Sequence, residues 1–495
     1  MPWGRNRRDG CISPFTYNKT ISRHEVHMNK KTVVVFILII AGAALVGCSK
    51  KQPGDPRLKN SFRRPEVNGW TFVHLEGTPL EIGFQHGYLL AAEIQEMKEI
   101  CALELNNDSK KEWPFFRNAA REMWWPRIEK EYREELQGIA DGVKARGIEL
   151  DLWDIVAMNG MLEWIYYSTV YDKTNLTPSG SAAPAERCSA FVATGSYTKD
   201  GKPIIAHNNW TYYIDGQRWT KIFDIIPAAG HRILMDGLPG FIASTDDFGI
   251  NSAGIMITET TISGFEGYDV NGIPEFVRAR NAMQYSSSID DFVRLMKEGN
   301  NGGYANDWLI ADRKTGEIAS LELGLKNVTL ERKKDGYFIG ANFPINPKLA
   351  LEETHYDTTD MGLSANARRL RWEQLMAENK GKIDVAAAQR FLADHFDTYQ
   401  KKDESNERTL CGHIDLSPRG SPAWQPPYGI AGAVQNKVTD ATMAEQMSFV
   451  AAAGHACGLA FKAEEHLRLH PEFSWQKKYL RDINSYPWTL FESSK

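Results

Sequence analysis

The order of apolar and polar positions divides this chain into a helical first part and a strand-rich second part. From 79 to 167 the apolar residues recur at helical spacing. The segment 174–186 is small, polar and contains two prolines, which is typical of a flexible linker. Directly after it, two apolar runs flank Lys199-Asp200-Gly201-Lys202, which predicts a β-hairpin over 188–207. The predicted helices of the first part are 79–94, 125–143 and 152–162.

Strand and helix patterns alternate in the second part. Short apolar runs separated by turn residues predict strands, and two stretches with helical spacing interrupt them. Such an order favours sheets layered with helices in an α+β fold. The predicted strands are 221–226, 231–235, 255–260, 308–312 and 318–322, and the predicted helices are 274–282, 289–297, 366–376 and 385–396.

The N-terminus has the pattern of an export signal. Asn29-Lys30-Lys31 precedes an apolar run over 33–46, which is too short to span a bilayer as a mature helix. Leu45-Val46-Gly47-Cys48 resembles the lipobox of bacterial lipoproteins, where the cysteine is lipidated and becomes the first residue. We therefore expect 1–47 to be an N-terminal extension with a signal peptide and Cys48 to carry a lipid anchor. An uncleaved anchor or a buried helix is the alternative.

Composition and charge narrow the class of protein further. The chain has a formal net charge of −5 and is 42% apolar, which is ample for a packed core. Its most basic stretches lie in 1–47 and in 48–69, a polar segment that is typical of a tether. An acidic body argues against nucleic acid as a partner. The sequence predicts an envelope protein held at a bacterial membrane by lipid.

Few cysteines lie outside the predicted signal peptide and the predicted lipid site. They are Cys101, Cys188, Cys411 and Cys457, and they contain no CxxC pair, so a zinc site is not expected. The twelve histidines include no HExxH motif. The sequence therefore predicts no metal and no cofactor, and leaves open a disulfide among the non-catalytic cysteines.

Cys188 is the strongest candidate nucleophile. It stands where the predicted linker meets the first strand of the hairpin. A cysteine that becomes N-terminal after cleavage can use its own α-amine as the base, because a free α-amine has a pKa near ~8. A small buried strand residue is the alternative interpretation of Cys188. The nearby His207, Trp210 and Asn306 favour a reactive site, since these polar groups follow or precede predicted strands and an asparagine amide can donate to an oxyanion.

Several ordered blocks of the chain resemble the phospholipase B-like proteins and, more distantly, the penicillin acyltransferase and bile-salt-hydrolase group of N-terminal-nucleophile enzymes. The likeness covers nearly all of 70–490. It is carried by Arg187-Cys188-Ser189-Ala190, Ala206-His207-Asn208-Asn209-Trp210, Ser244-Thr245-Asp246-Asp247-Phe248, Ser252-Ala253-Gly254, Glu259-Thr260-Thr261 and Gly432-Ala433-Val434-Gln435-Asn436, and upstream by Gly77-Thr78-Pro79-Leu80-Glu81-Ile82-Gly83 and Glu135-Leu136-Gln137-Gly138-Ile139-Ala140-Asp141-Gly142.

The resemblance implies an αββα four-layer sandwich and self-cleavage between Arg187 and Cys188. It implies a helical segment over 70–173, a linker over 174–187 that is cut on maturation, and a catalytic body over 188–495. Cys188 would be the nucleophile, His207 and Trp210 would flank its amine, and Asn306 would serve the oxyanion hole. Arg368 would close the site, although the neighbouring Arg369 allows a second register. Asn209 departs from the threonine of the phospholipase B-like pattern, which puts the detailed substrate preference in doubt.

The sequence thus predicts a self-processing hydrolase that deacylates fatty-acyl esters through a thioester at Cys188. Its partners would be a lipid or N-acyl small molecule and the membrane. An N-acyl amide hydrolase or acyltransferase is the first alternative, because a thioester serves both esters and amides. A non-catalytic surface binding protein of the same fold is the second.

Overall fold

The computed structural model describes residues 55–164, 188–245, 248–422 and 424–494. The predictions for Cys48, Arg187 and the linker 174–187 lie outside the described residues. Within the described ranges, no helix combines the length and the apolar character that crossing a bilayer requires.

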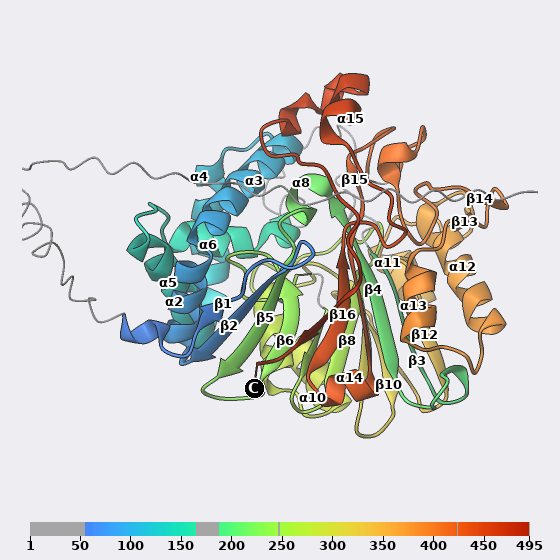
Figure 1. The fold of residues 1–495 in the computed structure, drawn as a ribbon, viewed down its shortest axis with the longest axis horizontal. Helices are drawn as coiled ribbons and strands as arrows, with labels where there is room; N and C mark the ends of the chain where they lie inside the picture. Colours follow the sequence, from blue (N-terminus) through green and yellow to red (C-terminus); the bar gives the residue numbers. More distant parts are fainter. Residues whose placement is uncertain (1–54, 165–187, 246–247, 423, 495) are drawn as a thin grey trace, which may run out of the picture. The chain divides into compact units, whose positions relative to one another are not determined.

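Two large sheets form the centre of the body (Figure 1). The nine-stranded sheet has the order β1-β2-β5-β6-β7-β8-β9-β10-β11, and the six-stranded sheet has the order β12-β3-β4-β15-β16-β17. Among the described strands of these two sheets, only β2 and β5 pair in parallel. The strands are β1 (Phe62–Arg63), β2 (Thr71–Gly77), β3 (Cys188–Thr194), β4 (Ile204–Tyr212), β5 (Lys221–Pro227), β6 (Ile233–Gly237), β7 (Gly249–Asn251), β8 (Ile255–Thr261), β9 (Asn306–Asp312), β10 (Ile318–Leu323), β11 (Val328–Lys333), β12 (Gly336–Gly340), β15 (Ala431–Asp440), β16 (Ser448–Ala453) and β17 (Thr489–Glu492), with a separate pair of β13 (Phe396–Asp397) and β14 (Lys402–Asp403).

Helices cover the outer face of each sheet (Figure 1). The N-terminal helices lie on the side of the nine-stranded sheet, and α12 and α13 lie on the side of the six-stranded sheet. The α-helices are α2 (Pro79–Leu89), α3 (Ala91–Ser109), α4 (Trp113–Ala119), α5 (Lys130–Ala145), α6 (Leu152–Asn159), α8 (Tyr213–Gly216), α9 (Glu275–Tyr285), α10 (Ile289–Lys297), α11 (Pro347–Glu353), α12 (Ser364–Glu378), α13 (Val385–Leu392), α14 (Ala441–Glu445) and α15 (Ala463–Leu469).

Three apolar clusters correspond to the spaces between these layers. The middle cluster joins the inner faces of the two sheets and includes Val192 of β3 and Leu309 of β9. The residue before each of these, Phe191 and Trp308, points the other way, into a cluster that faces the helices. This alternation is that of strands buried on both faces. The predicted αββα four-layer sandwich is confirmed.

The helical layer contains one unusually close helix contact. A Cβ atom on Gly83 of α2 would lie 1.9 Å from the carbonyl oxygen of Glu135, and one on Gly138 of α5 would lie 2.4 Å from that of Leu80. Any side chain at these positions would separate the two helices. The glycines of both helices therefore let the backbones touch, which fixes this layer against the sheet through β2.

The structure confirms the predicted hairpin as β3 and β4, but the first part is not wholly helical. β2 lies in the predicted helical segment 70–173 and pairs in parallel with β5, so this segment contributes a strand to the nine-stranded sheet. The helix predicted over 385–396 ends at Leu392, because the chain turns there toward β13. Such strand pairing joins residues about 150 positions apart, as His74 and Asp224 show, and it leaves no local signal.

Candidate active site

Cys188 is the first residue of β3 and is fully buried. It shares its face of the strand with Ala190 and Val192, which pack between the two sheets, so the thiol faces the sheet interface. Its direct partner across the hairpin is Asn209 of β4. Strand pairing therefore brings an amide beside the candidate nucleophile, at the residue where this sequence departs from the phospholipase B-like pattern.

Two polar side chains hold the backbone of Cys188. The backbone nitrogen of Cys188 donates to Asn342 Oδ1 at 3.1 Å. The guanidinium of Arg368 donates from Nη1 to the Cys188 carbonyl oxygen at 2.5 Å and from Nη2 to Asn342 Oδ1 at 3.0 Å. The three residues form one closed set of contacts, so the nitrogen and the carbonyl of Cys188 are both fixed.

The register of the arginine pair is settled by α12. Arg368 is fully buried and faces β3, where Nη1 also lies 3.0 Å from Ser189 Oγ. Arg369 points away, pairs with Glu373 at 3.1 Å and packs its guanidinium on Phe343. Successive helical residues are turned by about 100°, so only one of the two can reach Cys188.

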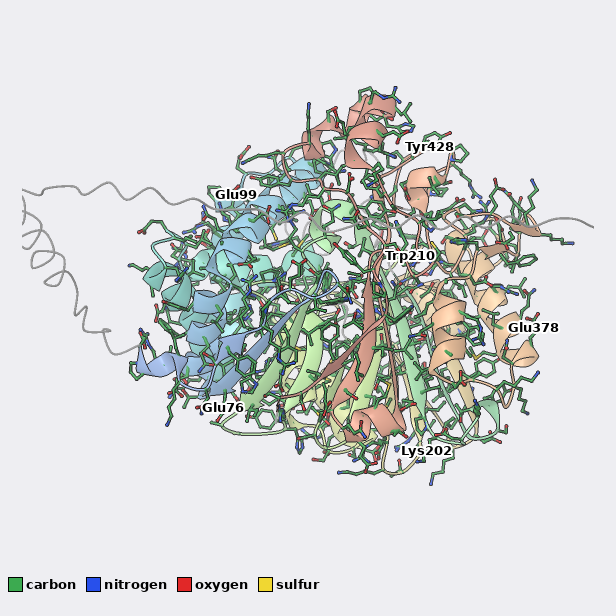
Figure 2. All side chains as sticks on the ribbon, viewed as in Figure 1. Glu76, Glu99, Lys202, Trp210, Glu378 and Tyr428 are labelled. Atoms are coloured by element: carbon green, nitrogen blue, oxygen red, sulfur yellow. The ribbon has the colours of Figure 1, made fainter. Side chains whose placement is uncertain are left out.

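Trp210 acts on the site through Arg368. The Arg368 guanidinium carbon lies 4.3 Å from the centre of the Trp210 indole, a cation–π contact between buried groups. Alternation along β4 turns Trp210 to the helix-facing side, whereas His207 shares the inward face with Ala190. Figure 2 shows Trp210 and Lys202 toward opposite ends of β4.

Asn306 lies differently from the sequence-based expectation. It begins β9, and the residues that share its face, Trp308 and Ile310, pack against the helical layer. By alternation its amide faces away from the sheet interface at which the Cys188 thiol lies. Asn342 is the amide that contacts Cys188, from a backbone position with a left-handed φ of 68°. No motif marks Asn342 in the sequence, although asparagine is among the few non-glycine residues that adopt this conformation readily.

A buried ion pair joins the two sheets behind the hairpin. Lys437 Nζ lies 2.7 Å from Asp236 Oδ2, with both side chains fully buried. Gln435 donates to the same carboxylate oxygen at 2.9 Å. Lys437 lies opposite His207 on β4, and Gln435 lies opposite Asn209. This polar row ties the Cys188 hairpin to the facing sheet, and sequence analysis did not identify it because its partners lie about 200 residues apart.

Asp307 is a second buried acid between the sheets. Burial raises the pKa of its carboxyl to about 8, and the hydrogen bond from Ser320 Oγ at 2.6 Å opposes that shift. Its cross-strand partner Thr260 lies close to Gly340 of the other sheet. A protonated carboxyl is thus favoured next to the strand end that carries Asn306.

The comparisons with known proteins agree with the sequence resemblance. The family model for Phospholipase B matches residues 93–487. Relatives include an uncharacterized protein of Archaeoglobus fulgidus (28% identity; 50% of this chain, 42% of that protein) and human phospholipase B-like 1 (25%; 51% and 49%). An acyl-coenzyme A:6-aminopenicillanic-acid-acyltransferase 40 kDa form of Emericella nidulans matches at 24% identity, over 46% of this chain and 57% of that protein.

The chain spans about half the length of the curated relatives it matches. Among solved structures, a variant of conjugated bile acid hydrolase from Clostridium perfringens aligns with 10% identity and a TM-score of 0.32, over 62% of this chain and 97% of that one.

Proposed function

We propose, from the premise that this chain belongs to the phospholipase B family, that it is a hydrolase or acyltransferase with Cys188 as its nucleophile. The carrying observation is the set of contacts from Asn342 and Arg368 to the nitrogen and carbonyl of Cys188. Any buried backbone group needs a hydrogen-bond partner, but here both partners are buried polar side chains, an amide on the nitrogen and a guanidinium on the carbonyl. Such fixing is what a nucleophile needs when its own nitrogen serves as the base.

The first step in this proposal is self-cleavage. The Cys188 thiol attacks the carbonyl carbon of Arg187, the new C–S bond forms as the C–N bond breaks, and the freed nitrogen takes up the thiol proton. Water then hydrolyses the thioester, which leaves a carboxylate on Arg187 and restores the thiol. The cleaved chain begins at Cys188, and Asn342 Oδ1 is already within hydrogen-bond distance of its nitrogen.

Turnover repeats the same chemistry on an acyl substrate. The α-amine takes the thiol proton, the thiolate attacks the acyl carbonyl, and the alcohol or amine leaves with the proton. Water or another acceptor then releases the acyl group.

One amide beside Cys188 is a candidate for oxyanion stabilisation. Asn209 Nδ2 is buried and has no hydrogen-bond partner within the described ranges, and its residue lies directly across from Cys188. Asn342 has a different role, because its Oδ1 accepts from the Cys188 nitrogen and its Nδ2 donates to the Thr261 carbonyl at 2.8 Å. Amide donors aimed at a developing oxyanion are a common device of acyl transfer. We therefore assign this role to Asn209 in place of Asn306.

Fatty-acyl esters are the proposed substrates, with N-acyl amides or acyl transfer as the alternative that the acyltransferase relative supports. The test gives processed protein matched fatty-acyl esters and fatty-acyl amides and measures the released acid. Faster release from esters supports deacylation, and faster release from amides favours the alternative. Release from neither, with Cys188 N-terminal and alkylatable, contradicts the enzyme proposal and favours the non-catalytic binding protein.

Attachment to the cell envelope is a separate proposal. It rests on the Leu45-Val46-Gly47-Cys48 pattern, which lies outside the described residues. A lipid on Cys48 would hold the catalytic body at a membrane, close to acyl lipids.

A further inference from the structure

Four side chains with nitrogen or sulfur donors meet away from Cys188. They are His395, Cys411, His413 and Cys457, and one donor atom of each lies within 4.8 Å of all the others. They come from three separate segments: the turn after α13, the loop before β15 and the loop after β16. Cys411 and His413 are buried, and His395 and Cys457 are half-buried.

The spacing of the donors matches the edges of a tetrahedron. His413 Nε2 lies 3.3 Å from His395 Nε2, 3.5 Å from Cys411 Sγ and 3.4 Å from Cys457 Sγ. Tetrahedral zinc binds nitrogen at about 2.0–2.1 Å and sulfur at about 2.3 Å, which separates two nitrogens by roughly 3.3 Å and a nitrogen from a sulfur by roughly 3.5 Å. All three distances from His413 Nε2 therefore fit a Cys₂His₂ site.

The surroundings of His413 also suit a metal ligand. Its other ring nitrogen, Nδ1, lies 3.9 Å from Asp415 Oδ1, and that oxygen accepts a hydrogen bond from Tyr213 at 2.6 Å. At 3.9 Å the carboxyl faces the ring from beyond hydrogen-bond distance; a carboxylate that hydrogen-bonds a ligating histidine orients the ring, and here Tyr213 holds the carboxyl in place.

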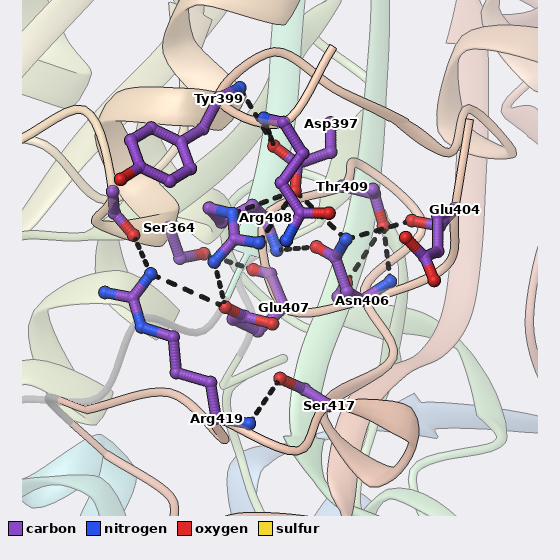
Figure 3. Close-up of polar contacts among 12 residues, drawn as sticks. Ser364, Asp397, Tyr399, Glu404, Asn406, Glu407, Arg408, Thr409, Ser417 and Arg419 are labelled. Atoms are coloured by element: carbon purple, nitrogen blue, oxygen red, sulfur yellow. Dashed lines mark hydrogen bonds and ion pairs between the residues drawn. The ribbon is translucent and has the colours of Figure 1, made fainter. Parts of the chain in front are cut away.

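The loop that supplies Cys411 and His413 is held in shape by other contacts (Figure 3). Arg408 Nε lies 2.9 Å from Asp397, and Arg408 also pairs with Glu407. Ser364 Oγ donates to the carbonyl of Glu407. The backbone nitrogen of Cys411 donates to the carbonyl of Asp394 at 3.1 Å, which joins the loop to the segment of His395. Three of the four ligands are thus positioned before any metal binds.

We propose that His395, Cys411, His413 and Cys457 bind one Zn²⁺ ion in a closed, structural site. Two thiolates and two imidazoles in tetrahedral arrangement favour Zn²⁺ over Mg²⁺ or Ca²⁺, which prefer oxygen ligands. Four protein ligands leave no open position, so the ion does not take part in catalysis. The sequence predicted no zinc site because it contains no CxxC pair; here the fold assembles the ligands from distant segments.

The site also supports the arginine of the candidate active site. Gly412 lies between two ligands and directly beneath Trp210, where a Cβ atom would be 2.1 Å from the indole. Trp210 in turn packs on Arg368, which holds Cys188. An ion that fixes residues 411–413 therefore fixes the surface on which Trp210 rests.

The test is metal analysis of the full chain, purified without chelator or polyhistidine tag. We expect about one zinc per chain by mass spectrometry, and loss of most of it in Cys457→Ser and in His395→Asn. Cys101→Ser, a buried cysteine of α3, and His355→Asn, an exposed histidine, are the controls and should keep their zinc.

Cobalt(II) gives a readout that does not depend on the variants. Exchange of Co²⁺ into the wild-type protein should give thiolate-to-metal charge-transfer absorption, which Cys411→Ser reduces. A zinc-free protein that takes up neither Zn²⁺ nor Co²⁺ contradicts the proposal, whether its thiols are free or joined. If peptide mass mapping finds Cys411 and Cys457 linked, with two hydrogens lost, the pair is a disulfide and the metal site does not exist.

Discussion

Arg368 donates a hydrogen bond from Nη1 to the carbonyl oxygen of Cys188, although 180 residues separate them in the chain. The same guanidinium bonds Asn342 and packs on Trp210. Arg368 thus connects the candidate nucleophile, the amide that holds its nitrogen and the aromatic side chain behind them. The predicted effects below follow from this arrangement.

Arg368→Gln is expected to impair both self-cleavage and turnover, with Arg369→Gln as the matched control. Each hydrogen bond from a charged group is worth about 1.5–3 kcal/mol, so loss of the contacts to Cys188 should reduce turnover by at least about tenfold. Arg369→Gln removes a surface pair with Glu373, worth about 0–1 kcal/mol, and a contact with Phe343, and neither touches Cys188. Fragment analysis and acyl release measure both steps. Equal losses in the two variants would contradict the assignment of Arg368.

Asn342→Ala and Asn209→Ala are expected to reduce turnover more than Asn306→Ala. Loss of Asn209, the proposed oxyanion donor, should cost about 10²–10³ in turnover, and loss of Asn342 removes the acceptor that holds the Cys188 nitrogen. Asn306 is on the helix-facing side of β9, so its alanine variant should affect mainly stability. The measurement is acyl release per processed chain, together with the melting temperature. If Asn306→Ala reduces turnover most while its stability is unchanged, the sequence-based assignment of Asn306 to the oxyanion hole is restored.

Cys188→Ala is expected to leave a single uncut chain. The thiol is the attacking group in the proposed cleavage, so its removal stops the reaction rather than slowing it. Denaturing electrophoresis and N-terminal sequencing of the wild type should give a fragment that begins Cys-Ser-Ala-Phe-Val. Cys101→Ala serves as the control and should be cut normally. Cleavage of Cys188→Ala at the same bond would mean that an external protease makes the cut.

Asp307→Asn is expected to stabilise the protein at pH 8 more than at pH 5. The folded pKa of Asp307, about 8, lies above the value of about 3.9 for an unfolded aspartate. The stability gained from the protonated carboxyl is therefore complete below about pH 4 and is lost as the pH rises toward 8, by at most about 1.4 kcal/mol per pH unit. Denaturant unfolding across this range measures the slope. Glu298→Gln, at an exposed position, is the control. If the stability of Asp307→Asn depends on pH as steeply as that of the wild type, the Asp307 carboxyl is ionised when folded.

Cys48→Ala is expected to release the protein from the detergent phase in a phase-partition experiment. The lipid would be attached to the Cys48 sulfur, so alanine removes the attachment point. Ser49→Ala keeps Cys48 and should partition as the wild type does. Retention of Cys48→Ala in the detergent phase would point to an uncleaved N-terminal anchor.

The amino-acid sequence by itself determined the hairpin and its candidate nucleophile. Alternation of apolar and polar residues and the Asp200-Gly201 turn are local signals, because strand pairing in a hairpin involves neighbouring segments. The helices of α10 and α12 were likewise predictable from their periodicity, and the ordered motifs pointed to the family that the comparisons confirm.

Only the tertiary structure decided which polar groups meet. A shift of one residue reverses the face of a strand and turns a helical side chain by about 100°, so sequence could not choose between Arg368 and Arg369 or show that Asn306 faces the helices. Asn342 reaches Cys188, and Cys457 reaches His413, across loops whose paths depend on the packing of both sheets. Contacts of this kind join distant segments through the register of the whole sandwich, and no local pattern encodes them.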